Sequence, residues 1–279
     1  MYELFLIVIA LLWLAAATAS DFKKREIPDW ISFSLIAFAL AYRAFVSLFA
    51  GEWGFFFSGV IGLGIFWALG NGMYRTGFGG GDAKLLMALG AVLPFSFFYL
   101  ENFKIMVVFL FAFLFLGAGY SFVYSIGIVL TNIKKFRIKL EQRIASHSKL
   151  MIIFAAFFTL ALILSIFNVM ILPVAVLLLL FLILFIYSKA VEDIMITKVA
   201  SKNLTVGDWL VDKVKIGSQI IMPRTTGLSE HEVWLLRKHH KSVKIKQGIP
   251  FTISFLLAFI VIVWLWYSNW GFLNYNLWF

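Results

Sequence analysis

The chain has 279 residues, of which 62% are hydrophobic and only 14% are charged, and its mean hydropathy is +0.96. This composition excludes an ordinary soluble domain, in which about a quarter of the residues are charged. The formal net charge of +10 is interpreted as a signal of membrane topology and of attraction to anionic lipids, and not as nucleic-acid binding. The absence of cysteine excludes disulfides, a thiolate nucleophile and a Cys-based zinc site.

Apolar segments long enough to cross a membrane recur along the chain. A helix needs about 20 residues to cross a hydrocarbon core of roughly 30 Å. We predict about eight such helices, at residues 2-20, 28-50, 54-71, 83-100, 103-131, 150-168, 171-188 and 250-268. The expected fold is an all-α polytopic membrane protein with a small α+β cytoplasmic domain.

The basic residues predict how these helices are oriented. They gather in four connecting segments, 21-27, 72-82, 132-149 and 189-249, with Lys84 one turn beyond the second; only Arg43 and Lys104 lie elsewhere. By the positive-inside rule these segments are cytoplasmic, so both termini are expected outside the cell membrane. The first apolar segment is followed, not preceded, by basic residues, which indicates an uncleaved helix rather than a signal peptide.

The later part of the chain contains a tight hairpin and one sizeable polar region. The segments 150-168 and 171-188 contain no ionisable residue, so their expected role is packing. Within 189-249, alternation predicts strands at Trp209 to Ile216 and at Ser242 to Lys246. Ser229 and Glu232 form a capping box before a short helix. The sequence HEVWL begins like a zinc-protease motif but ends in Leu235 instead of His, so no metal site is predicted.

Two aspartates lie where connecting segments meet predicted spans. Asp21 follows the first span in TASDFKKREIPDW, and Asp82 precedes the fourth in GFGGGDAKLL. Ionisable groups at a membrane boundary are costly and are functional candidates by default. The alternatives are that Asp21 is a solvated residue paired with Lys23 or Lys24, and that Asp82 only caps a helix that begins at Ala83.

Two carboxylates at the same depth suit amide hydrolysis by water. If they approach closely, repulsion and desolvation raise one pKa, so that one group is protonated and the other ionised. The ionised group can take a proton from water while the protonated group polarises the scissile carbonyl. The glycine-rich loop before Asp82 leaves room for an extended substrate backbone. This chemistry needs no metal or cofactor.

Three motifs resemble a known family. GGGD, Gly79 to Asp82, resembles the Gly-x-Gly-Asp signature of membrane aspartic proteases. DFKKREIPDW resembles the first-aspartate motif of the type IV prepilin peptidases, with Asp29 where that family usually has Asn. KQGIPFTISFLLAF, Lys246 to Phe259, resembles the closing Ile-Pro segment of the archaeal preflagellin (prearchaellin) peptidases.

The resemblance implies an activity and partners. Such enzymes remove short, basic class III leader peptides from prepilins and prearchaellins at the cytoplasmic membrane face. It implies that Asp21 and Asp82 are catalytic and that Gly79 and Gly81 are the loop glycines. Because the chain lacks cysteine and the bacterial insertion, we expect peptidase activity without methyltransferase activity. The basic leader is expected to contact acidic residues, for which the candidates are Glu26, Asp29, Glu192 and Asp193.

These expectations divide the chain into five parts. They are a catalytic membrane core (1-131), a basic cytoplasmic loop (132-149), a transmembrane hairpin (150-188), a small cytoplasmic domain (189-249), and a last span with an external tail (250-279). Three alternatives remain open. They are a transporter, although mid-span acids are absent, a scaffold that acts through 189-249, and a presenilin-like protease that cuts inside the membrane.

Overall fold

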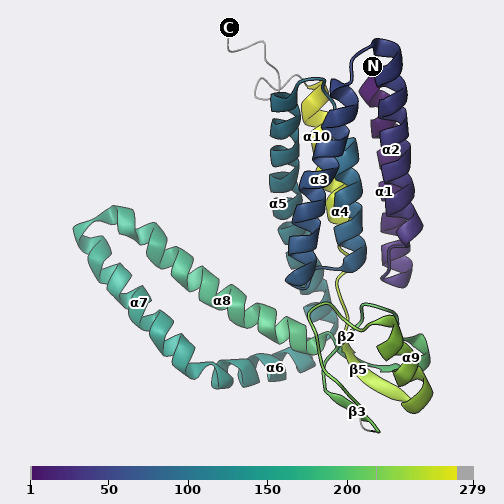
Figure 1. The fold of residues 1–279 in the computed structure, drawn as a ribbon. Helices are drawn as coiled ribbons and strands as arrows, with labels where there is room; N and C mark the ends of the chain where they lie inside the picture. Colours follow the sequence, from purple (N-terminus) through teal and green to yellow (C-terminus); the bar gives the residue numbers. More distant parts are fainter. Residues whose placement is uncertain (1, 218, 269–279) are drawn as a thin grey trace.

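The computed structural model describes residues 2–217 and 219–268. Its first part is a bundle of helices with one connected apolar core. The helices of the bundle are α1 (Tyr2–Lys24), α2 (Asp29–Ala50), α3 (Gly54–Arg75), α4 (Gly80–Val92), α5 (Tyr99–Thr131) and, from the far end of the chain, α10 (Thr252–Tyr267). The start of α1 and the end of α10 lie at the same end of the bundle (Figure 1). The tail that was expected outside the cell begins at the end of α10, and residues 269–279 of it lie outside the described residues.

Six helices among the described residues are long and apolar enough to cross a membrane. They are α1, α2, α3, α5, α7 (Ser148–Phe167), and the helical segment Val169–Ile194, which consists of the short 3₁₀ turn η1 (Val169–Ile171) and α8 (Leu172–Ile194). These spans agree with a polytopic membrane protein. The count of about eight stays a prediction, because α4 and α10 are shorter than these six.

The predicted span 83-100 differs from the observed structure. α4 ends at Val92, residues 93–98 are not helical, and α5 begins at Tyr99. Leu93 still has helical dihedral angles, but Pro94 explains the break, because it has no backbone N–H with which to continue the helix. The fully buried Arg43 guanidinium donates to the carbonyl groups of Ala91, Val92 and Pro94. It thereby satisfies carbonyls that the end of a helix would otherwise leave without partners.

α4 is the most enclosed helix of the bundle and packs against α1, α2 and α3. Its approach to α3 is close because glycines face each other. A Cβ atom at Gly62 would clash with the Gly90 carbonyl oxygen, and one at Gly90 would clash with the Gly62 carbonyl oxygen. Small residues permit such backbone contact between membrane helices. The position of Asp82 at the start of α4 therefore depends on this packing.

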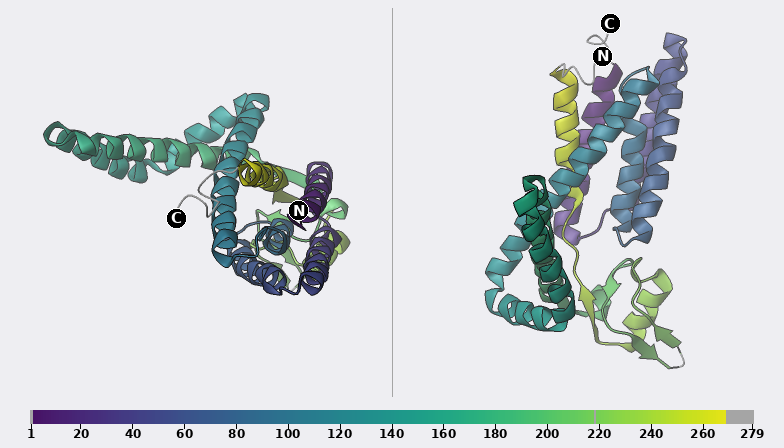
Figure 2. Two further views of the ribbon diagram at one scale, coloured as in Figure 1. Left: turned by 90° about the horizontal axis from the view of Figure 1, so that it is seen from above. Right: turned by 90° about the vertical axis from the view of Figure 1, so that its left-hand side faces the viewer.

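The segment 132-149, predicted as a loop, is instead the helix α6 (Ile133–Ser146). It contains neither glycine nor proline and is rich in residues that favour helix. Its Phe136 ring lies 5.7 Å from the Tyr187 ring of α8. α6 leads into the α7–α8 hairpin, which leaves the base of the bundle and extends away from it (Figures 1 and 2). The predicted hairpin is thus present, but it lies beside the bundle rather than within it.

Between α8 and α10 the chain forms a small domain, residues 196–246, with its own apolar core. Its elements are β1 (Ile196–Ala200), the 3₁₀ turn η2 (Ser201–Asn203), β2 (Trp209–Leu210), β3 (Val214–Ile216), β4 (Gln219–Ile221), α9 (Glu230–His239) and β5 (Ser242–Lys246). β5 is the central strand of an antiparallel sheet in the order β1-β5-β2, and β3 pairs with β4.

The predicted elements of this region are largely present. The strand at Ser242 to Lys246 and the Ser229/Glu232 capping box are confirmed. The predicted strand at Trp209 to Ile216 is divided, because β2 joins the main sheet whereas β3 turns back to pair with β4. The domain lies beneath the end of the bundle where α1 ends and α4 begins (Figure 1).

Candidate active site

Asp21 lies in the last turns of α1 and is 8% exposed. Its Oδ2 atom accepts hydrogen bonds from the backbone N–H of Thr252 at 3.0 Å and from the Thr252 hydroxyl at 2.7 Å. Thr252 is the first residue of α10, where backbone N–H groups have no helical partner and favour a negative charge. The interpretation of Asp21 as a solvated residue paired with Lys23 or Lys24 is therefore wrong.

Asp82 lies in the first turn of α4, three residues after the N-cap Gly79. The interpretation of Asp82 as the cap of a helix beginning at Ala83 is thus also wrong. Its Oδ1 atom lies 3.5 Å from the Thr252 hydroxyl oxygen, the same oxygen that contacts Asp21. The separation of the two carboxylate oxygens cannot exceed the sum of these two distances. Residues 231 and 170 positions apart from Thr252 thus meet around one hydroxyl.

The electrostatic environment of Asp82 favours its protonated form. Asp82 lies outside the six helices that are long and apolar enough to span a membrane. Its pKa is raised from 3.8 to about 7; burial is the largest cause, the nearby Asp21 carboxylate also raises the pKa, and the hydrogen bond from Thr252 lowers it. A protonated carboxyl group beside a carboxylate is the arrangement that acid and base catalysis by a carboxyl pair requires.

The glycines before Asp82 give its carboxylate room. A Cβ atom at Gly79 would lie 2.6 Å from Asp82 Oδ2, too close for both to keep their positions. A Cβ atom at Gly81 would lie 3.0 Å from the Cβ of Ile27, on the segment that follows α1. Gly77 has a φ of 100°, which side chains of L-residues disfavour. The loop therefore brings the start of α4 close to the end of α1.

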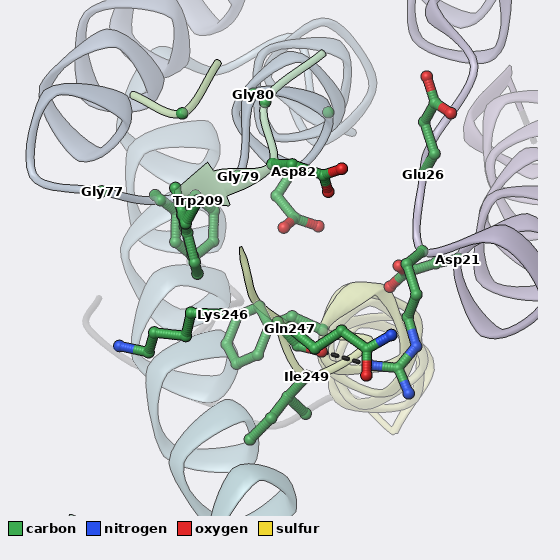
Figure 3. A pocket seen from close by; sticks show the side chains of 18 of the residues that line it. Asp21, Glu26, Gly77, Gly79, Gly80, Asp82, Trp209, Lys246, Gln247 and Ile249 are labelled. Carbon is green, nitrogen blue, oxygen red and sulfur yellow. Dashed lines mark hydrogen bonds between the residues drawn. The ribbon is translucent and has the colours of Figure 1, made fainter. Parts of the chain in front are cut away.

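A cavity of about 1430 Å³ adjoins both aspartates. Figure 3 shows Asp21 from the end of α1 and Asp82 from the start of α4 at its wall, together with the loop residues Gly77 and Gly79. Its other walls come from the small domain, including Trp209, and from α5 and α8. The cavity thus lies between the bundle and the small domain, and it has room for an extended peptide.

Three of the acidic residues predicted to contact a leader lie at this cavity, namely Glu26, Asp29 and Glu192. Asp29 Oδ1 accepts from Lys84 Nζ at 2.6 Å. Glu192 Oε2 lies 3.4 Å from Lys246 Nζ.

Glu26 and Asp193 differ from Asp29 and Glu192. Glu26 is exposed at the cavity wall, and its carboxylate has no ion pair among the described residues (Figure 3). Asp193 does not line the cavity; its two oxygens accept from the Arg143 guanidinium of α6 at 2.6 and 2.7 Å. Of the four predicted acids, Glu26 is the one that a basic ligand meets without displacing a lysine or arginine of the chain.

Two residues at the site were not identified from the sequence. Thr252 links both aspartates. The feature of the sequence that could have indicated it is its position two residues after Pro250, at the start of an apolar helix. Arg25 follows α1 and donates to the Gly248 carbonyl group and, at 3.0 Å, to the Tyr124 hydroxyl. Arg25 thereby ties the end of α1 to the segment that leads into α10, and it holds Asp21 next to Thr252.

Comparison with known proteins gives a family for the first part of the chain. Residues 8–122 match the type IV leader peptidase family. A preflagellin peptidase of Methanocaldococcus jannaschii is 32% identical over 114 residues, which cover 36% of this chain and 49% of that protein. A preflagellin peptidase of Methanococcus maripaludis is 34% identical over 87 residues, which cover 31% of this chain and 38% of that protein.

A further relative is the prepilin peptidase EppA of Methanothermobacter thermautotrophicus, which is 35% identical over 96 residues, or 34% of this chain and 25% of that protein. The chain thus spans half or less of the length of each of these curated relatives. The match includes both Asp21 and Asp82, since they lie within residues 8–122. No solved structure matches the chain.

Proposed function

Because this chain belongs, through residues 8–122, to the type IV leader peptidase family, we propose that it is a membrane aspartic endopeptidase. Its substrates are prepilin-like or prearchaellin-like precursors. It removes their short basic leader peptide at the cytoplasmic membrane face, just before the apolar helix. The names of the archaeal relatives support this substrate class.

The observation that carries the proposal is the meeting of Asp21 and Asp82 around the Thr252 hydroxyl, at the wall of a large cavity. Neither aspartate has an ion pair among the described residues that would explain its burial. Two buried carboxyl groups without cationic partners are costly, and such groups collect at functional sites.

The surroundings of the two groups suggest different roles. Asp21 accepts two hydrogen bonds from Thr252 at the positive end of α10, which suits the ionised base that takes a proton from water. Asp82, with its raised pKa, suits the acid that donates a hydrogen bond to the scissile carbonyl oxygen. Water adds to the carbonyl carbon, the C–N bond breaks, and the leaving amine takes up a proton. No metal or cofactor enters this scheme.

The cavity supplies the place for the leader. Glu26 faces a basic leader side chain directly, whereas Asp29 and Glu192 exchange their lysine partners for it. Such exchange costs little because these ion pairs are partly exposed. Asp193 does not enter the proposal, since Arg143 occupies both of its oxygens.

The test is cleavage of a synthetic prepilin-like precursor by the full-length protein in reconstituted vesicles, with the mass of each product. The variants are Asp21→Asn and Asp82→Asn. The control is Asp212→Asn, since that carboxylate pairs with Lys244 on the surface of the small domain. We expect both site variants to lose activity by at least roughly a thousandfold, and the control to cut at the parental rate.

The product masses separate the alternatives. A cut between the basic leader and the apolar helix, with an unmethylated new amino terminus, supports the proposal in full. A cut inside the apolar helix points to a presenilin-like protease. Cleavage by either site variant at the parental rate contradicts the two-aspartate mechanism. If the parent protein cleaves nothing, the result favours the alternative that the protein is a transporter.

A further inference from the structure

One face of α8 adjoins the active-site cavity. Alternating steps of three and four residues connect Val174, Leu177, Phe181, Leu184, Ser188, Val191 and Met195. Positions at such steps lie on one face of a helix. We call these residues the α8 stripe. The hairpin partner α7 covers it only in part, since Leu177 is 62% exposed and Phe181 is 60% exposed.

The lower half of the α8 stripe belongs to the wall of the active-site cavity. Leu184, Ser188, Val191 and Met195 all line that cavity. Its upper half borders a shallow apolar depression between side chains of α8 itself, lined by Val174, Leu177, Leu178, Leu180, Phe181 and again Leu184. Leu184 belongs to both, so the cavity beside the aspartates continues into an apolar track along α8.

α5 supplies a second surface beside this track. Ser121, Phe122 and Ser125 of α5 line the same cavity as the lower stripe. Ser125 and the α8 residue Tyr187 share a hydrogen bond of 2.9 Å, which joins the two helices at the base. Beyond that point α5 and α8 diverge (Figure 1). Phe115 lies one heptad before Phe122, and Phe111 lies two heptads before Ser125. Their side chains are 81% and 70% exposed.

The stripe is also held in place before anything packs on it. The Phe181 ring stacks on the Phe154 ring of α7 with centroids 5.9 Å apart. At the base, Arg143 of α6 is paired with Asp193 of α8 through two hydrogen bonds. A preorganised surface loses little conformational entropy when a partner binds. Lipid chains do not need continuity with a catalytic cavity.

We propose that the α8 stripe, opposite α5, binds the apolar helix of the precursor while its leader lies in the cavity. This inference rests on the proposed function, because a precursor cut just before its apolar helix must place that helix next to Asp21 and Asp82. The apolar track that begins at Leu184 provides the surface for it. The α7–α8 hairpin is then a substrate-binding element rather than only a packing element.

The test uses the absence of cysteine from the natural chain. Single cysteines are placed at Leu184 on the stripe and, as a control, at Leu179 on the opposite face of α8; these leucines are 40% and 41% exposed. Both variants also carry Asp82→Asn, so that a synthetic precursor with one cysteine in the second turn of its apolar helix stays uncut. Oxidative crosslinking in vesicles is followed by the mass of the adduct.

We expect roughly tenfold more adduct with the precursor for Leu184→Cys than for Leu179→Cys, because binding raises the local concentration of the second thiol. Equal yields for the two variants overturn the inference. A dimer of the enzyme as the main product of Leu184→Cys also overturns it, since the face then binds a second copy. Crosslinking does not need cleavage, so this experiment tests the inference even if the parent protein cleaves no substrate.

A cleavage arm separates this inference from the proposed function. The double variant Leu177→Ala/Phe181→Ala is compared with Leu179→Ala/Ile183→Ala on a full precursor and on a short peptide that ends a few residues after the cut. We expect the ratio of kcat/KM for precursor over peptide to fall roughly tenfold only in the stripe variant. An unchanged ratio, with both substrates cut by the parent protein, overturns the helix site and leaves the peptidase in place.

Discussion

The Thr252 hydroxyl is the most informative single group to remove. In Thr252→Val a methyl group replaces the hydroxyl at a fully buried position, while the backbone N–H still donates to Asp21. The lost hydrogen bond of 2.7 Å joins a hydroxyl to a carboxyl group. A hydrogen bond to a charged group contributes about 1.5–3 kcal/mol. If the transition state keeps this bond, its loss lowers kcat/KM roughly 10- to 100-fold.

The same substitution has a second effect that a merely structural role does not produce. The Thr252 hydroxyl lowers the pKa of Asp82, so its removal lets that pKa rise further. Since the proposed mechanism needs protonated Asp82, the alkaline limb of the pH profile should move to higher pH in Thr252→Val. Thr252→Ser keeps the hydroxyl and is expected to retain most of the rate and the parental profile.

The assay is kcat/KM for a synthetic precursor as a function of pH, with the protein in reconstituted vesicles. Two results would refute the reasoning. One is a Thr252→Val enzyme with the parental rate. The other is an equal loss in Thr252→Ser and Thr252→Val with no change in the pH profile, which would reduce Thr252 to a packing residue.

Three further predictions concern the loop, the pH dependence and the break in α4. Gly79→Ala should reduce activity at least roughly tenfold by displacing the Asp82 carboxylate, whereas Gly64→Ala, where a Cβ meets nothing within 4 Å, should not; equal activities would contradict the crowding argument. Because the pKa of Asp82 is raised from 3.8 to about 7, the folded protein holds a proton that the unfolded chain releases. Its thermal stability in detergent should therefore fall as pH rises through this window, and Asp82→Asn should remove that slope; an equal slope in both proteins would show that another group titrates. Arg43→Leu leaves the carbonyls at the end of α4 without donors and should reduce the free energy of unfolding by at least about 3 kcal/mol, and a change below about 1 kcal/mol, measured by chemical denaturation in micelles, would contradict the assigned role.

Much of the architecture was predictable because its causes are local. Runs of about 20 apolar residues are sufficient to identify membrane helices, and six of the predicted spans are long helices in the structure. The Ser229/Glu232 capping box involves residues three positions apart, so the sequence alone identifies it. Asp21 and Asp82 were identified as candidates because each ends a connecting segment at a predicted span, beside a recognisable motif.

Other predictions failed where distant residues decide. Nothing near Val92 in the sequence indicates that Arg43 donates hydrogen bonds to the carbonyl groups at the end of α4, which lies about fifty residues later along the chain. The basic segment 132-149 was predicted as a loop from its charge, but Phe136 packs against α8 and the segment is helical. The charge pattern predicts on which side of the membrane this segment lies, yet it carries no information on packing.

By itself, then, the sequence determined the apolar helices, the small mixed domain and the positions of two aspartates at helix ends, because hydrophobic periodicity, helix caps and short motifs act over a few residues. Only the tertiary structure decided that Thr252 joins Asp21 to Asp82, that Arg143 occupies Asp193 while Glu26 stays open to the cavity, and that the α8 stripe continues from that cavity. These features depend on contacts between residues dozens to hundreds of positions apart. Such contacts form only when the packing of the whole bundle brings α1, α4, α8 and α10 together.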